Sequence, residues 1–187
     1  MNLTGTRINP SWRKPGCLLR SNFPENIWGW LLDTSSLTLR LQNTYGGEFK
    51  VQLLNQGWAR PCREEARILG LRTGAFANVR EVYLLCRGRP CVFARTVIPA
   101  RTLSGKYRRL TRLGGKSLGA VLFADKSMRR SNLEIAHIMP GQHLFERASH
   151  GLPVKPRIIW GRRSLFHLAE KPLLLSEIFL HDMPQSV

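Results

Sequence analysis

Two arginines lie in otherwise apolar strand patterns near the middle of the chain, where they could bind an anion. Residues 79–99 contain two runs rich in Val, Leu, Phe and Thr around a turn at 87–90, which is typical of a β-hairpin. With that turn, Arg80 and Arg95 share one face, and both are candidates for substrate binding. A buried guanidinium needs an anion. The alternative is that each arginine pairs with a structural carboxylate or extends its charged end at the sheet edge.

A glutamate near the C-terminus stands in an equally apolar pattern. Residues 158–168 and 173–180 predict a second hairpin, and Glu177 alternates there with leucines and a phenylalanine. A carboxylate in such surroundings can act as an acid or base with a raised pKa. An ion pair with Arg162 or Arg163 is the structural alternative.

A glycine-rich turn precedes a short apolar run. Gly114, Gly115, Lys116 and Ser117 lead into residues 118–123, which predicts a short helix. Free backbone N–H groups at its start, beside a lysine, could hold an anion. An ordinary helix cap explains the same residues.

The cysteines and histidines do not indicate a metal site. The four cysteines show no Cys-x-x-Cys spacing, and the five histidines show no ligand spacing on a defined element, so we expect no metal. Cys86 and Cys91 would face each other across the first hairpin, and we expect both to be reduced in a cytoplasmic protein. Neither a signal peptide nor a membrane span is apparent, so we expect no stable membrane insertion.

The composition is that of a globular chain with an unusual charge. With 187 residues we expect a single domain spanning 1–187, with an irregular arm at 1–24. The formal net charge is +17, but it is spread along the chain, so we expect capture of a small dianion rather than nucleic-acid binding.

The remaining patterns indicate a mixture of helices and strands. Residues 25–33 suit a helix, whereas 34–43 suit a helix or, through alternating leucines, a strand. We expect strands at 49–58 and 131–138, one helical turn at 64–69, and a loop at 139–156, whereas 100–112 is basic and without clear periodicity.

Several stretches together resemble the chorismate pyruvate-lyase family, in family order over most of residues 80–180. The matching residues are Arg80-Glu81-Val82, Ala94-Arg95-Thr96-Val97-Ile98-Pro99, Thr102-Leu103-Ser104-Gly105, Leu118-Gly119, Leu122-Phe123, Glu134-Ile135, Trp160-Gly161-Arg162-Arg163-Ser164 and Lys171-Pro172-Leu173-Leu174-Leu175-Ser176-Glu177-Ile178-Phe179-Leu180.

The resemblance implies an α+β fold with a single antiparallel β-sheet flanked by helices, and helical flaps over an internal site without cofactor. By position, Arg80 resembles the family's carboxylate-binding arginine, and Leu118 the residue whose backbone N–H assists it. Glu177 resembles the acidic residue that faces the ring oxygen. Leu37 falls in the first flap, where the family often has methionine. Residues 139–157 form a longer segment than the family usually has.

The implied reaction converts chorismate to 4-hydroxybenzoate and pyruvate, the first committed step of ubiquinone biosynthesis. Arginine binds carboxylate bidentately and keeps its charge, and a glutamate can assist proton movement. A pericyclic route, in which the protein mainly holds geometry, is also open. The competing interpretations are a non-catalytic sensor of small aromatic acids with a related fold and a nucleic-acid binder. We expect a monomer.

Overall fold

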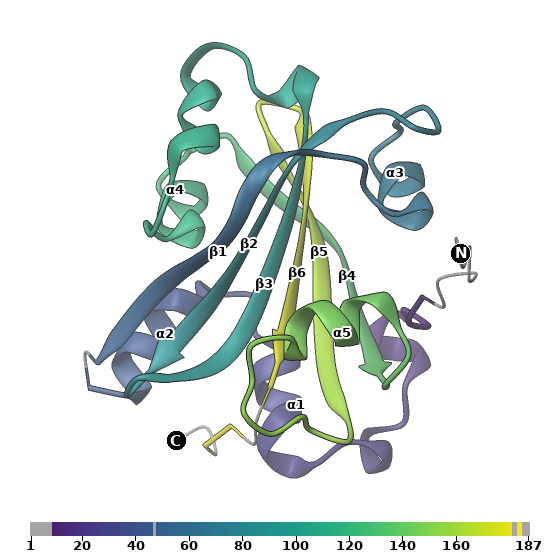
Figure 1. The fold of residues 1–187 in the computed structure, drawn as a ribbon, viewed down its shortest axis with the longest axis vertical. Helices are drawn as coiled ribbons and strands as arrows, with labels where there is room; N and C mark the ends of the chain where they lie inside the picture. Colours follow the sequence, from purple (N-terminus) through teal and green to yellow (C-terminus); the bar gives the residue numbers. More distant parts are fainter. Residues whose placement is uncertain (1–8, 47, 181–182, 185–187) are drawn as a thin grey trace.

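The fold is built on one six-stranded antiparallel sheet with the strand order β1-β2-β3-β6-β5-β4 (Figure 1). The computed structural model describes residues 9–46, 48–180 and 183–184. The strands are β1 (Phe49–Ala59), β2 (Ala77–Cys86), β3 (Arg89–Pro99), β4 (Met128–Ile138), β5 (Ile159–Leu168) and β6 (Lys171–Phe179). The structure confirms the expected antiparallel sheet and both hairpins. It also confirms the strands that we expected at 49–58 and 131–138.

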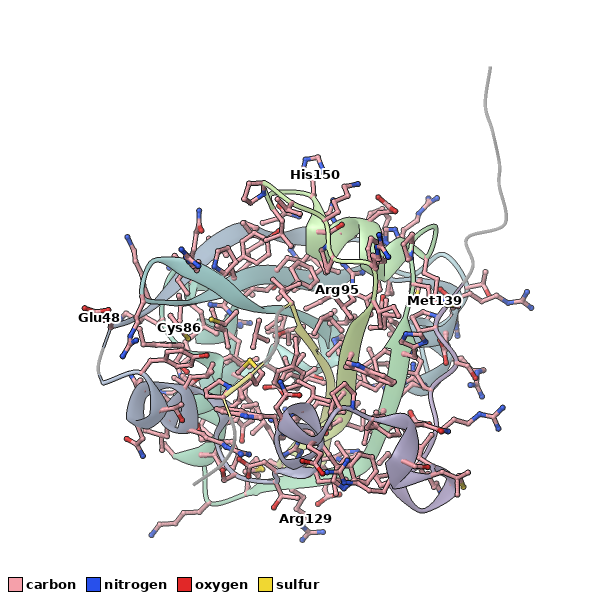
Figure 2. The ribbon with its side chains drawn as sticks, turned by 90° about the horizontal axis from the view of Figure 1, so that it is seen from below. Glu48, Cys86, Arg95, Arg129, Met139 and His150 are labelled. Atoms are coloured by element: carbon pink, nitrogen blue, oxygen red, sulfur yellow. The ribbon has the colours of Figure 1, made fainter. Side chains whose placement is uncertain are left out.

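Helices cover both faces of this sheet. They are α1 (Glu25–Leu32), α2 (Leu37–Thr44), α3 (Arg63–Ile68), α4 (Leu118–Phe123) and α5 (His143–Ser149). A large apolar core joins one face to α1, α2 and α4, whereas two smaller cores join the opposite face to α5 and α3. Figure 2 shows α5 on one side of the sheet and α1 and α2 on the other. The α+β class with flanking helices is therefore confirmed.

The first two helices form because their apolar residues and their caps agree. Ile27, Trp30 and Leu31 are buried at helical spacing in α1. The side chain of Ser36 accepts from the backbone N–H of Leu39 at the start of α2. The helix interpretation of 34–43 is thus correct, and the strand alternative is wrong.

The first hairpin has a different register from the one we expected. Its turn consists of Arg87 and Gly88 alone, both with positive φ, and a bulge follows where Pro90 stands opposite Leu85. The extra residue, Cys91, shifts every later side chain of β3 to the other face. Arg80 therefore lies opposite Thr96 rather than Val97.

The shift separates the two arginines that we expected on one face. Arg95 is directly opposite Glu81, so its side chain leaves the face that carries Arg80. The predicted pairing of Cys86 with Cys91 is also wrong, since Cys86 lies opposite Arg89. Both cysteines are buried and carry free thiols.

Two segments that lacked helical periodicity are nevertheless ordered. Residues Gly105–Arg112 form a 3₁₀ helix that buries Tyr107 and Leu110, and a spacing of three matches its three residues per turn. The expected loop at 139–156 contains α5, whose carbonyl at Ala148 accepts from the hydroxyl of Tyr83 at 2.9 Å. With only seven residues, α5 is too short to show a clear period.

The N-terminal arm is attached to the sheet beyond its first residues. Of the arm expected at 1–24, residues 1–8 lie outside the described part. The remainder contains the short 3₁₀ helices Pro15–Cys17 and Arg20–Asn22, and Arg13 forms a bridge with Ile135 of β4. Within the described residues, no helix has the length and apolar character to cross a membrane.

Candidate active site

A pocket lies between the sheet and helices α2 and α4. The strand residues that line it come from all six strands and face the main core: Val51, Arg80, Val82, Leu84, Ala94, Thr96, Arg130, Arg162, Phe166, Leu175 and Glu177. The helical side contributes Ser35, Leu37, Thr38, Ser117, Leu118, Gly119, Leu122 and Phe123. Apolar walls thus surround a small number of charged groups, as is common in ligand sites.

Arg80 is buried in this pocket without a carboxylate partner. Only 2% of the residue is exposed, and one terminal nitrogen donates to the carbonyls of Gly114 and Lys116, both at 2.8 Å. Its Nε makes no hydrogen bond, and no described carboxylate forms an ion pair with it. Burial lowers the pKa of Arg80 to about 10, because nothing nearby compensates the charge.

The same arginine positions the start of α4. The two carbonyls that accept from Arg80 belong to the glycine turn, and Ser117 follows as the helix cap, accepting from the N–H of Ala120 at 3.2 Å. Leu118, the first residue of α4, is 5% exposed and lines the pocket. The turn and helix predicted at 114–123 are confirmed, and the ordinary cap is present.

Glu177 lies on the same face, in an ion pair. Its Oε2 accepts from Nε of Arg162 at 2.6 Å, whereas no described group bonds to Oε1. Arg162 is 1% exposed and also donates to the carbonyls of Trp30 and Asp33. The structural alternative for Glu177 is therefore present, but the carboxylate still lines the pocket.

Sheet geometry relates Arg80 to Glu177. Arg80 is opposite Thr96, and Thr96 is opposite Leu175. Glu177 is two residues farther along β6. Strand spacings place the two backbones about 10 Å apart across the sheet and about 7 Å apart along it. The side chains of both residues line the same pocket.

A third arginine, Arg130 of β4, lines the pocket at the far side from Arg80. Its Nε donates to the hydroxyl of Ser164 at 2.9 Å, and Nη1 donates to the carbonyl of Asp33 at 3.3 Å. Burial, and then the neighbouring charge of Arg162, lower the pKa of Arg130. The carboxylates of Glu177 and Asp33 oppose this lowering of the pKa only in part.

Arg95 lies on the opposite face, among carboxylates. It binds both oxygens of Glu65, at 2.8 and 3.0 Å, and Oε1 of Glu81 at 2.7 Å. Arg147 of α5 also pairs with Glu81. Burial opposes the charge of Arg95, but these bonds raise its pKa. Its expected place in the substrate site is wrong, because the bulge at Cys91 turns it away from the pocket.

Helices α2 and α4 meet above the pocket through their first turns. The hydroxyls of Thr38 and Ser117 share a hydrogen bond of 2.9 Å. Gly119 packs so closely against Ser36 and Thr38 that an added Cβ would lie 3.4 Å from each hydroxyl oxygen. Leu37, the first residue of α2, is 4% exposed and completes the apolar cover.

The structure thus brings together four of the five residues that the sequence suggested, and places Arg95 elsewhere. Arg80, Glu177, Leu37 and Leu118 all line one pocket. Sequence reasoning gave no site role to Arg130, because the strand was expected to begin at Ser131. A bulge in β4 between Ser131 and Glu134 interrupts the alternation that would have identified it.

Metal-binding residues do not gather in this pocket. Across residues 9–46, 48–180 and 183–184, no three His, Cys, Asp or Glu side chains come together in a group suited to a metal ion. The polar groups of the pocket are instead guanidinium, carboxylate and hydroxyl. Such groups bind and orient an organic anion.

The chain is similar in sequence to one family over nearly its full length. The model of the chorismate lyase family matches residues 8–185. A probable chorismate pyruvate-lyase of Methylococcus capsulatus is 44% identical over 156 residues, which cover 81% of this chain and 92% of the relative. A probable chorismate pyruvate-lyase of Nitrosomonas eutropha is 40% identical over 162 residues, covering 87% and 90%.

Solved structures share the fold at much lower identity. The effector domain of PhnF from Mycobacterium smegmatis superposes with a TM-score of 0.60 at 17% identity, covering 83% of this chain and 94% of that domain. The ligand-binding domain of a putative GntR-family transcriptional regulator from Bordetella bronchiseptica gives a TM-score of 0.54 at 17% identity, covering 75% and 91%. At such identity the likeness concerns the fold alone.

Proposed function

The chain belongs to the chorismate lyase family, and we propose from its pocket that it is a carbon–oxygen lyase that converts chorismate to 4-hydroxybenzoate and pyruvate. The observation that carries the proposal is a buried arginine without a carboxylate, facing a buried carboxylate across an apolar pocket. Arg80 and Glu177 occupy these positions.

Arg80 is proposed to bind the ring carboxylate of chorismate. A bound carboxylate would supply the counter-charge that this guanidinium lacks and would use the nitrogens that no protein group occupies. The contrast with Arg95 supports this role, because Arg95 has two carboxylates of its own. Following the family resemblance, the backbone N–H of Leu118 would give a second contact to the same carboxylate.

Glu177 is proposed to act at the opposite end of the ring. Aromatisation requires loss of the hydrogen at C4 and cleavage of the C3–O ether bond, whose oxygen leaves with the pyruvate. Oε1 of Glu177 makes no bond to a described group and is available for the proton or for the C4 hydroxyl. Arg162 holds Oε2 at 2.6 Å and so orients the carboxylate.

The wider context of the reaction is also proposed. The product, 4-hydroxybenzoate, would enter ubiquinone biosynthesis, and the protein would act as a cytoplasmic monomer with 1–187 as a single domain. We expect no resident metal or organic cofactor, since the described part of the chain holds no group of His, Cys, Asp or Glu side chains suited to a metal ion, so activity should survive treatment with a chelator. Loss of activity in chelator, restored by one divalent ion, would contradict this part.

The direct test is to incubate the purified protein with chorismate and to measure both products. Formation of 4-hydroxybenzoate and pyruvate in equal amounts is expected. Binding of 4-hydroxybenzoate without turnover of chorismate would instead identify a sensor of aromatic acids.

The Arg80→Ala variant tests the assignment of the carboxylate site. It should weaken binding of both substrate and product, by about 2–5 kcal/mol for a buried charged contact. An Arg80→Ala protein that binds 4-hydroxybenzoate as tightly as the parent would contradict the assignment.

A further inference from the structure

The charges that line the pocket do not balance. Three guanidinium groups face it, from Arg80, Arg130 and Arg162, but Glu177 is its only carboxylate among the described lining residues. Glu177 is committed to Arg162 at 2.6 Å. Neither Arg80 nor Arg130 forms an ion pair with a described carboxylate, so two positive charges are left without a direct partner. A buried excess of this size is costly unless a ligand with two negative charges fills the pocket.

The two unbalanced arginines stand at opposite ends of one row across the sheet. Arg80 is opposite Thr96, Thr96 is opposite Leu175, and Leu175 is opposite Ser164. The guanidinium of Arg130 is fixed at the end of this row by its bond to the Ser164 hydroxyl. Three strand spacings, about 14 Å, separate the strand of Arg80 from that of Ser164. Long side chains that reach inward from the two ends can hold a molecule with two carboxylates.

Arg130 is held in place by neutral groups and keeps a free donor. Ser164 and the carbonyl of Asp33 accept from Nε and Nη1, and the guanidinium lies 5.4 Å from the ring centroid of Phe166. Nη2 bonds to no described group and is not among the enclosed unbonded atoms. The side chain is thus already oriented, and one donor remains open for a ligand oxygen.

We infer that Arg130 is the residue that binds the second carboxylate of chorismate, the one on the enolpyruvyl group. This inference rests on the proposed function and adds a specificity residue to it. With Arg80 on the ring carboxylate, Glu177 faces C4, and the ether at the neighbouring C3 directs the enolpyruvyl group toward the side of Arg130. The dianion then balances both free charges.

The inference predicts that Arg130 contributes differently to the binding of substrate and of product. Chorismate has two carboxylates and 4-hydroxybenzoate has one, so Arg130 contributes to binding of the first only. Once the ether bond is broken, pyruvate takes the second carboxylate away. Arg80, in contrast, contacts a carboxylate that substrate and product share.

The test uses Arg130→Met, which removes the charge but keeps an apolar stem against Phe166. KM for chorismate should rise 10- to 100-fold, whereas the dissociation constant of 4-hydroxybenzoate should change less than threefold. Arg129→Ala is the matched control, because Arg129 is the adjacent arginine, exposed and paired with Glu170 at the surface. It should change neither quantity.

A binding measurement keeps the result independent of turnover and of the variant's folding. The probe is a stable aromatic mimic, 3-(1-carboxyvinyloxy)-4-hydroxybenzoate, compared by calorimetry with its methyl ester at the enolpyruvyl carboxylate. The parent should bind the diacid at least tenfold more tightly than the ester, and Arg130→Met should remove this preference.

The possible outcomes separate the inference from the proposed function. A parent that binds diacid and ester equally overturns the inference, as does an Arg130→Met variant with unchanged KM for chorismate. An equal loss of chorismate and 4-hydroxybenzoate binding in Arg130→Met also overturns it, because it would indicate a structural role. Absence of chorismate turnover in the parent would overturn the proposed function, whatever Arg130 does.

Discussion

Arg80 and Arg95 are the same residue type on neighbouring strands, yet they lie in opposite electrostatic surroundings. Arg95 is bound by Glu65 and Glu81, which raise its pKa, whereas burial lowers the pKa of Arg80 because no described carboxylate lies beside it. Arg95 thus forms structural ion pairs, whereas Arg80 forms no ion pair with a described carboxylate and is the one proposed to bind a ligand. The structural interpretation is thus correct for Arg95, whereas the binding of a ligand anion by Arg80 stays a proposal.

Replacement of Glu177 tests its chemical role. Glu177→Gln keeps the shape and leaves an oxygen that can accept from Arg162, so it should lower kcat more than it weakens binding of 4-hydroxybenzoate. A general acid or base contributes about 10²–10⁴-fold, and we expect a drop in kcat of that size in steady-state assays. A drop smaller than about tenfold would favour the pericyclic route.

The control for Glu177→Gln removes a glutamate charge from the opposite face of the sheet. Glu134 accepts from Nε of Arg163 at 2.8 Å, away from the pocket. Glu134→Gln should therefore leave kcat unchanged, although it also weakens an ion pair. Similar losses of kcat in Glu177→Gln and Glu134→Gln would show that both ion pairs affect activity only through the stability of the protein.

Glu65 provides a prediction about stability and pH. Its bonds to Arg95 and to the N–H of Cys62 outweigh burial, and they lower the pKa of Glu65 below its usual 4.5. A carboxyl whose pKa is lower in the folded state stabilises fully above the unfolded pKa, and this contribution disappears as the pH falls through the folded pKa. Glu65→Gln should cost about 3 kcal/mol at pH 7 and should flatten the decline of stability in acid.

Urea unfolding at a series of pH values below about 7 measures both effects. Glu48→Gln is the matched control, since Glu48 pairs with Arg87 at the surface at 4.0 Å, and it should change stability by less than about 1 kcal/mol. Parallel pH profiles for the parent and Glu65→Gln would disprove the assignment.

Elements with a regular period could be predicted, and those without one could not. The strands and α1 show a period of two or of 3.6 residues, so their positions followed from the sequence. The bulge at Cys91 leaves no comparable signal, because two neighbouring apolar residues fit either face of a sheet buried on both sides. One inserted residue was enough to place Arg95 wrongly.

The residues of the candidate site likewise divide into those that the sequence identified and those that it did not. Arg80 and Glu177 stood out because each is a charge in a long apolar alternation. Arg130 lies beside Arg129 before an irregular stretch of β4. Its position in the pocket therefore depends on a strand that begins earlier than the sequence suggested. Its proposed role depends on hydrogen bonds to Ser164 and Asp33, which only the tertiary structure brings near.

The contact between α2 and α4 predicts how product leaves. The two helices cover the pocket, and the hydrogen bond between Thr38 and Ser117, at 2.9 Å, joins their first turns. We expect release of the proposed product, 4-hydroxybenzoate, to require separation of these turns. Thr38→Val keeps the shape but removes this bond, which is worth about 0.5–1.5 kcal/mol. Product dissociation, measured by stopped flow, should become about 2–10 times faster.

The control lies on the same helix. The hydroxyl of Thr44 bonds to the carbonyl of Arg40 at an exposed position, so Thr44→Val should leave product dissociation unchanged. An unchanged dissociation rate in Thr38→Val would show that the two helices separate elsewhere or that the bond does not hold them.

At the scale of the whole molecule, the net charge of +17 is an excess spread over the surface. Most described carboxylates already form ion pairs, for example Glu146 with Lys155 and Glu170 with Arg129. The surplus arginines and lysines therefore give a diffuse positive field. Such a field would draw the proposed dianionic substrate toward the protein, and it would act at a distance from the contacts proposed for Arg80 and Arg130.

Salt should separate this long-range attraction from the contacts in the pocket. The screening length falls from about 10 Å at 0.1 M salt to about 3 Å at 1 M, so KM for chorismate should rise severalfold over this range. kcat should stay nearly constant, because buried pairs are screened much less. A mixed-sequence DNA duplex, titrated at physiological salt, should bind weakly. A diffuse positive field is enough to attract a small dianion, whereas tight duplex binding would need a dense basic face. Tight duplex binding with a steep dependence on salt, together with a salt-independent KM, would show that the charge serves a nucleic acid instead.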